Sequence, residues 1–202
     1  MTGFRRGRDR NDRSSGQSLV EFALVFPMFF ILFLGFIEFA FAFNAILGVN
    51  FASRNAALAA AEAGAAQGAD CVILTGIEED VAAPANRTNI IKVDIYRAKS
   101  NGDDYLPAQR TTYTRTSSGP CTLPDGTVIT IPYTRTANAY PELERCNILA
   151  GCPGPNNHTT IDHIGVRVYY DHPYVTPLTT FVGTGDGIIF DRSNVMRMEP
   201  IL

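Results

Sequence analysis

One long apolar run dominates the first quarter of the chain. Residues 22–37 carry no charge, and after Glu38 another 15 uncharged residues follow. Because a helix rises ~1.5 Å per residue, a helix over residues 17–38 spans roughly 30 Å, about the thickness of a bilayer's hydrocarbon core. The pattern therefore predicts a transmembrane helix over residues 17–43, with Glu38 marking its outer boundary.

The helical pattern continues beyond the apolar run. Residues 44–69 are rich in alanine, which has the highest intrinsic helix propensity, and contain no helix-breaking glycine from position 49 until Gly64. We therefore expect one helix from about Gln17 to Ala66. The small side chains of the extension allow close packing against a sheet or another helix.

After residue 70 the pattern changes to strands. The tetrapeptide YTRT occurs at 113–116 and again at 133–136, separated by a stretch with Gly, Pro and Asp-Gly turn signals, so a hairpin is predicted there. All eight tyrosines lie in this part, whereas nine of the 13 phenylalanines lie between Phe22 and Phe43. We predict an α+β fold with about four to six antiparallel strands. Segments rich in β-branched and aromatic residues are 89–98, 127–137, 163–174 and 187–198.

The distribution of charge predicts the orientation of the chain. Residues 1–16 contain five arginines and two aspartates, a net charge of +3, and because the whole chain carries −3 the remainder carries −6. A basic segment ahead of an apolar helix stays in the cytoplasm, which favours a single-pass protein of the cytoplasmic membrane with its C-terminal domain outside. The pair Arg5-Arg6 is compatible with twin-arginine export, but the apolar run is longer than such signals. We expect no nucleic-acid partner.

A short motif at the start of the apolar run resembles a known processing site. The stretch GQSLVEF, Gly16 to Phe22, resembles the cleavage site of type IV-like prepilins. The longer string GQSLVEFALVFPMFFILFLGFIEFA resembles the TadE-like pseudopilins, or minor pilins, of tight-adherence (Flp) pilus systems. The closing SNVMRMEP, residues 193–200, is similar to the end of such proteins. Residues 70–190 match no motif of this kind.

The resemblance implies a function and several partners. A prepilin peptidase would cut after Gly16, so that the mature chain begins at Gln17 and Glu21 becomes its fifth residue, followed by Phe22. The Glu21 carboxylate would then pair in the membrane with the α-amino group of a neighbouring subunit. The chain would be a membrane-anchored minor pilin of pilin-like fold, and its partners would be other pilin or pseudopilin subunits and pilus assembly proteins.

These observations divide the chain into four parts and leave alternatives open. The parts are a basic leader (1–16), a transmembrane helix (17–43), an Ala-rich helix extension (44–69) and an extracytoplasmic β-rich domain (70–202). An uncleaved signal anchor would carry this domain as a binding or surface module without a filament role. Cleavage at the A-x-A pattern Ala40–Ala42 would release a soluble protein.

Four cysteines, Cys71, Cys121, Cys146 and Cys152, lie in the segment predicted to be outside the cytoplasm, where disulfides persist. Four cysteines allow three connectivities. The short loop between Cys146 and Cys152 favours a bridge that closes it and leaves Cys71 to pair with Cys121, although sequence spacing does not determine geometry. The absence of a CxxC pattern argues against a zinc ribbon.

One group of residues raises the question of catalysis: His158, Asp162, His163, Asp171 and His172. They lie between a Pro-rich loop and a strand, where helical spacing of metal ligands has no meaning, so polar residues at a strand entry are the expected interpretation. The chain also lacks the G-x-S-x-G and S-x-x-K patterns of common hydrolases. We therefore expect no enzyme activity, no metal and no cofactor.

Overall fold

The computed structural model describes residues 11–83, 85–104, 109–152, 158–177 and 187–200 of the 202-residue chain, with the side chains of residues 11–15 left aside. The chain divides into two compact units. The first contains the described parts of 1–40 and 174–185, and the second those of 41–173 and 186–202. Helix α1 contributes residues to both units.

Helix α1 extends over Asn11–Ala63 and contains Pro27 in its interior. It starts inside the segment predicted as a leader and stops three residues before the predicted end. The reason for the early end is Gly64, which has a φ of +61° and whose N–H donates to the carbonyl of Ala60. Glycine ends many helices in this way because the left-handed conformation costs it little.

A second helix, α2 (Ala69–Asp80), was not predicted. Its side chains Ile73, Leu74 and Ile77 have helical spacing and are buried. The Glu142 carboxylate accepts hydrogen bonds from the N–H groups of Gly68 and Asp70, at 2.8 Å each, and so satisfies free donors at the start of the helix. This cap comes from a residue more than 70 positions away, which no local pattern reveals.

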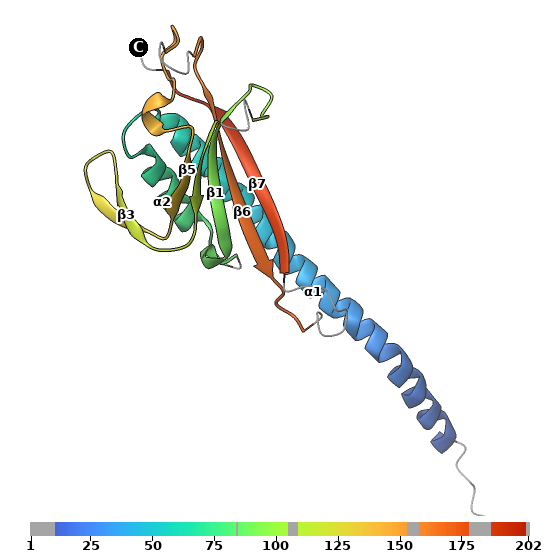
Figure 1. Ribbon diagram of the computed structural model, residues 1–202. Coiled ribbons are helices and arrows are strands. Elements are labelled where there is room, and N and C mark those ends of the chain that lie inside the picture. The colour runs from blue at the N-terminus through green and yellow to red at the C-terminus, as the bar shows by residue number, and fades with distance from the viewer. Residues whose placement is uncertain (1–10, 84, 105–108, 153–157, 178–186, 201–202) are drawn as a thin grey trace, which may run out of the picture. The chain divides into compact units, whose positions relative to one another are not determined.

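The strands form a five-stranded antiparallel sheet in the order β5-β2-β1-β6-β7 (Figure 1). The α+β class predicted from the sequence is confirmed, and all four strand segments named above contain strands. A separate two-stranded sheet is formed by β3 and β4. The strands are β1 (Ile90–Ala98), β2 (Arg110–Thr114), β3 (Gly119–Thr122), β4 (Val128–Ile131), β5 (Thr134–Asn138), β6 (His163–Pro173) and β7 (Gly187–Arg197), with short 3-10 helices η1 (Arg87–Asn89) and η2 (Glu142–Glu144).

The two YTRT copies lie on neighbouring strands, as the hairpin prediction required. Tyr113 pairs with Arg135 and Thr114 with Thr134, which joins β2 to β5. The residues between the copies form a further hairpin, β3–β4, whose turn contains Gly126 at a φ of +86°. The second hairpin therefore projects from the connection between two strands of the main sheet.

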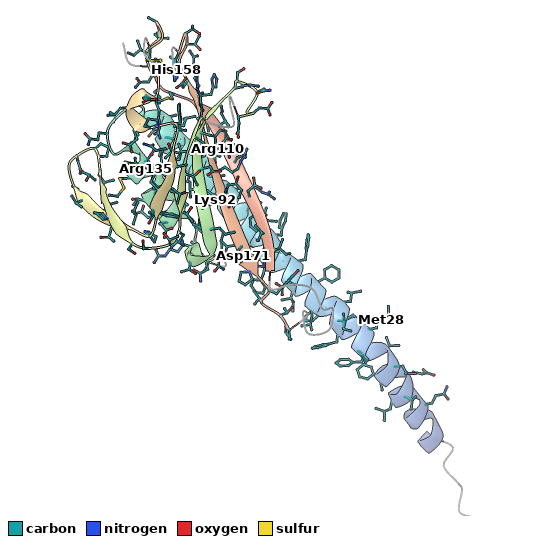
Figure 2. All side chains as sticks on the ribbon, viewed as in Figure 1. Met28, Lys92, Arg110, Arg135, His158 and Asp171 are labelled. Carbon is teal, nitrogen blue, oxygen red and sulfur yellow. A yellow bond between two sulfur atoms is a disulfide. The ribbon has the colours of Figure 1, made fainter. Side chains whose placement is uncertain are left out.

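The core of the second unit lies between one face of the main sheet and two helical segments, α2 and residues 41–63 of α1 (Figure 1). The helix α1 contributes mostly alanines, whose small side chains let its backbone approach the sheet closely. The opposite face of the sheet is polar and carries Lys92 and Arg110 (Figure 2). The buried residues of α1 in this core are Ala45, Val49, Ala52, Ala56, Ala57, Ala60 and Ala61.

Two disulfides, Cys71–Cys121 and Cys146–Cys152, give the pairing that the short loop favoured. The first joins α2 to β3 across 50 residues and the second closes a loop of six. Because the stabilisation grows with the loop that is closed, replacing both Cys71 and Cys121 by alanine should cost about 4 kcal/mol of unfolding free energy and the matched Cys146/Cys152 pair about 2. Urea unfolding of both variants in detergent micelles measures the difference. Equal losses would contradict the loop-length explanation.

Candidate functional site

The first part of α1 exposes an almost continuous apolar surface. Met28, with 75% of its side chain exposed, projects outward from the helix (Figure 2). Among the helices that the structure describes, α1 is long and apolar enough to cross a membrane by its length and composition. The chain thus has a candidate membrane anchor near its N-terminus. Its exposed large apolar residues up to position 41 are Leu19, Val20, Phe22, Leu24, Val25, Phe26, Met28, Phe29, Phe30, Ile31, Leu32, Phe33, Phe36, Phe39 and Phe41.

The residues of the predicted processing motif lie together in the first turns of this exposed segment. Gly16, Gln17, Glu21 and Phe22 are all exposed. The Gln17 side-chain amide donates a hydrogen bond of 3.1 Å to the Glu21 carboxylate, one turn further along. The space beside Gly16 is open, with no heavy atom within 4 Å of where a Cβ would be. Processing at Gly16 stays a prediction, but the motif is accessible on the helix surface.

Glu21 has a neutral partner in its own chain. Gln17 donates to it, and among the side chains that the structure describes no cation lies within ion-pair distance of its carboxylate. A carboxylate in or next to lipid is costly unless an opposite charge or several donors compensate it. The surface around Glu21 can therefore accept a cationic group from another molecule.

Glu38 is a residue whose role sequence reasoning missed. We expected it only to mark the end of the apolar run, yet its side chain is 4% exposed. Its carboxylate accepts hydrogen bonds from the backbone N–H of Val175, at 3.0 and 3.1 Å, and of Thr176, at 2.8 Å. A lone carboxylate within an apolar helix is a signal that such partners are needed. The partners themselves lie 137 and 138 residues away, which the sequence does not indicate.

A buried cluster surrounds Asp162 near one end of the second unit. Its carboxylate accepts hydrogen bonds from Arg97 Nε at 2.8 Å, from the Tyr140 hydroxyl at 2.9 Å and from the Cys146 N–H at 3.0 Å. Nδ1 of His158, labelled in Figure 2, lies 2.8 Å from Asp162 Oδ2 without a well-aligned hydrogen bond. Burial lowers the pKa of His158, and because Arg97 already balances Asp162 we assign the neutral imidazole.

The structure separates the His and Asp residues that the sequence analysis grouped. Of the five, the structure brings His158 and Asp162 together and places the other three along β6. In the described parts of the chain, no group of three His, Cys, Asp or Glu side chains is arranged to hold a metal. The backbone also converges here, because the Met198 N–H donates to the Asp162 carbonyl. Asp162 thus joins β1, the disulfide loop and the C-terminal segment.

A second buried carboxylate, Asp70, connects α2 to its surroundings. It accepts a hydrogen bond of 2.8 Å from the Tyr113 hydroxyl and pairs with the buried guanidinium of Arg145. Burial, followed by the negative charge of Asp70, raises the pKa of Tyr113 well above its ordinary value, so the phenol stays protonated and donates. In both networks the buried carboxylate is bound by donors from distant segments, which is the character of a structural link.

The C-terminal segment SNVMRMEP lies against α1 within the second unit. Asn194 donates to Ser53 Oγ at 2.6 Å and to the Asn50 carbonyl at 3.3 Å. The Glu199 N–H donates to the carbonyl of Ala61 at 3.1 Å. The segment that resembles the ends of TadE-like proteins therefore connects β7 to α1 by hydrogen bonds.

Comparison with known proteins supports the assignment of the N-terminal segment. Residues 16–69 match the family model described as TadE-like protein. The comparisons with curated proteins and with solved structures gave no match. The match begins at Gly16 and includes the exposed apolar part of α1, Glu21 and Glu38, and the alanine face that packs on the sheet. Residues 16–69 of this chain are therefore a TadE-like segment, as the motif that starts at Gly16 predicted.

Proposed function

We propose that this protein is a membrane-anchored minor pilin or pseudopilin of a tight-adherence (Flp-type) pilus assembly or secretion system, and that it assembles through its N-terminal helix. The observation that carries the proposal is the exposed apolar surface of α1 with Glu21 near its start, inside the segment that matches the TadE-like family. The proposal assigns no catalytic step to the chain.

The position of the two glutamates supports a partner for Glu21 inside the membrane. Glu21 and Glu38 are 17 positions apart, which is ~26 Å of helix and less than the ~30 Å of a hydrocarbon core, so at least one of the two carboxylates lies within the lipid. Glu38 has two backbone donors, whereas Glu21 has the neutral Gln17 amide. In the proposed assembly, the α-amino group of a neighbouring processed subunit supplies the positive charge that compensates the Glu21 carboxylate.

The orientation in this proposal has the N-terminus in the cytoplasm and the β domain outside. The arginine-rich leader favours this direction. The two disulfides of the second unit support it, because such bonds persist in oxidising compartments and are rare in the cytoplasm.

The test is the intact mass and the N-terminal sequence of the protein isolated from the membranes of its own host. We expect a mature chain that begins at Gln17. Gly16→Val should block this cleavage, and Gly35→Val is a matched control, because both glycines are in α1 with no heavy atom within 4 Å of an added Cβ. A chain that still begins at Met1 would contradict the proposal and favour an uncleaved anchor that carries a binding module.

A further inference from the structure

The segment that follows β6 is held against α1 within the first unit. Both oxygens of Glu38 accept hydrogen bonds from Val175 N, and one of them also accepts from Thr176 N. Tyr174 is half-buried, whereas Val175, with 59% of its side chain exposed, and Pro177 are open. The backbone of this segment is therefore bonded to one residue of the helix, while most of the Val175 residue stays exposed.

Glu38 lies at the position along α1 where the hydrocarbon core of a bilayer would end. If the hydrocarbon core of ~30 Å starts near Leu19, it ends about 20 residues later, at Glu38 and Phe39. Next to Glu38, the exposed Phe36 and Phe39 continue the apolar surface of the helix. A segment fixed to Glu38 is thus adjacent to the region where lipid chains meet headgroups.

The composition of the segment fits that environment. Residues 173–177, PYVTP, carry no charge. Tyrosine is favoured at membrane interfaces because its ring is apolar and its hydroxyl is polar. The hydrogen bonds to Glu38 also matter here, because backbone N–H groups near lipid need acceptors and a carboxylate near lipid needs donors.

We propose that Tyr174 and Val175 form a second, non-helical contact with the lipid bilayer, and that the hydrogen bonds to Glu38 keep this contact at the interface. This segment, which we call the interfacial segment, adds a second membrane attachment to the one provided by α1. The inference goes beyond the pilus role: it requires that α1 crosses a membrane but neither cleavage at Gly16 nor a filament.

The chain contains no tryptophan, so a single introduced tryptophan reports one position. Three variants of the full chain, each in vesicles of phosphatidylcholine and phosphatidylglycerol, test the proposal. Val175→Trp probes the interfacial segment, Phe29→Trp marks the centre of the apolar helix and Val128→Trp, on β4, marks a water-exposed position. The three original side chains are 59%, 62% and 64% exposed, so the replacements are matched.

The readout is quenching of tryptophan fluorescence by phosphatidylcholine brominated at shallow or deep chain positions. We expect Val175→Trp to be quenched most by the shallow label, Phe29→Trp by the deep label and Val128→Trp by neither. The proposal would be overturned if the tryptophan of Val175→Trp emitted at the same wavelength as that of Val128→Trp and were not quenched by either brominated lipid. Blue-shifted emission without lipid quenching would also overturn it, because the segment would then contact protein.

A second comparison tests the role of Glu38. Adding Glu38→Ala to Val175→Trp removes the acceptor of both N–H groups, and we expect most of the shallow quenching to be lost. Adding Glu62→Ala, which removes an exposed carboxylate further along α1, should leave the quenching unchanged. Unchanged quenching after Glu38→Ala would overturn the proposal that Glu38 keeps the interfacial segment in contact with lipid. Glu38→Ala is also added to Phe29→Trp. Loss of the deep quenching in that protein would show that Glu38→Ala removes the helix itself from the membrane, and would also overturn the proposal.

Discussion

Replacing Glu21 by alanine is expected to reduce the yield of assembled pili at least tenfold without lowering the amount of protein in the membrane. In the proposed assembly, the change removes the carboxylate that would pair with the α-amino group of a neighbouring subunit. Removing one member of a buried ion pair costs about 3–5 kcal/mol, and about 1.4 kcal/mol already corresponds to a tenfold change in association. Pili sheared from whole cells measure the assembled fraction, and immunoblots of membranes measure the total.

Two further variants separate charge from position. Glu21→Gln keeps the size and one acceptor oxygen but removes the negative charge, so it should show a loss close to that of alanine. Glu62→Ala removes an exposed glutamate of the same helix and should assemble normally. Normal pilus yield from Glu21→Ala would argue strongly against pairing through Glu21, even if the chain is cleaved after Gly16.

Replacing Asp162 by alanine should lower the free energy of unfolding by about 3–5 kcal/mol, because it leaves a buried guanidinium without its counter-ion. Arg97 Nε, the Tyr140 hydroxyl and the Cys146 N–H would each lose the acceptor that Asp162 provides. The change also removes the side-chain link between β1 and the disulfide loop, whereas the bond from the Met198 N–H to the Asp162 carbonyl stays. Urea unfolding in detergent micelles, followed by near-ultraviolet circular dichroism of the tyrosines, measures the loss.

The control is Asp103→Ala, in the loop after β1. Asp103 is exposed and hydrogen bonds with Asn101 two residues away, so its replacement should cost under about 1 kcal/mol. Asp162→Asn should fall between the two, because it keeps the shape but removes the charge opposite Arg97. If Asp162→Ala cost no more than Asp103→Ala, the cluster would not be the structural link that its geometry indicates.

Several features were predictable because they depend on neighbouring residues. The apolar run that follows Gly16 indicates a helix in lipid from composition and length alone, and alternating apolar residues indicate strands such as β1 and β6. Gly64 ends α1 because glycine adopts the left-handed backbone conformation at little cost. The disulfide Cys146–Cys152 closes a short loop, so spacing favoured its pairing without determining it.

The predicted site residues of the processing motif are equally local. Gly16, Gln17, Glu21 and Phe22 fall within two helical turns, so any helix through them places Gln17 next to Glu21. The His and Asp residues show the opposite case. Their positions in the sequence raised the question of a shared site, but β6 extends three of them along a strand. Asp162 lies beside His158 and is bound by Arg97 and Tyr140, which come from distant segments.

The sequence by itself therefore determined the helix that is long and apolar enough to cross a membrane, the α+β class and the position of the motif around Glu21, since each depends on the order of nearby residues. The tertiary structure alone decided that Glu142 caps α2, that Asp162 links separate segments and that Glu38 binds Val175 and Thr176. These contacts join residues between 16 and 138 positions apart. They form because a buried or partly buried carboxylate must find donors wherever the fold brings them.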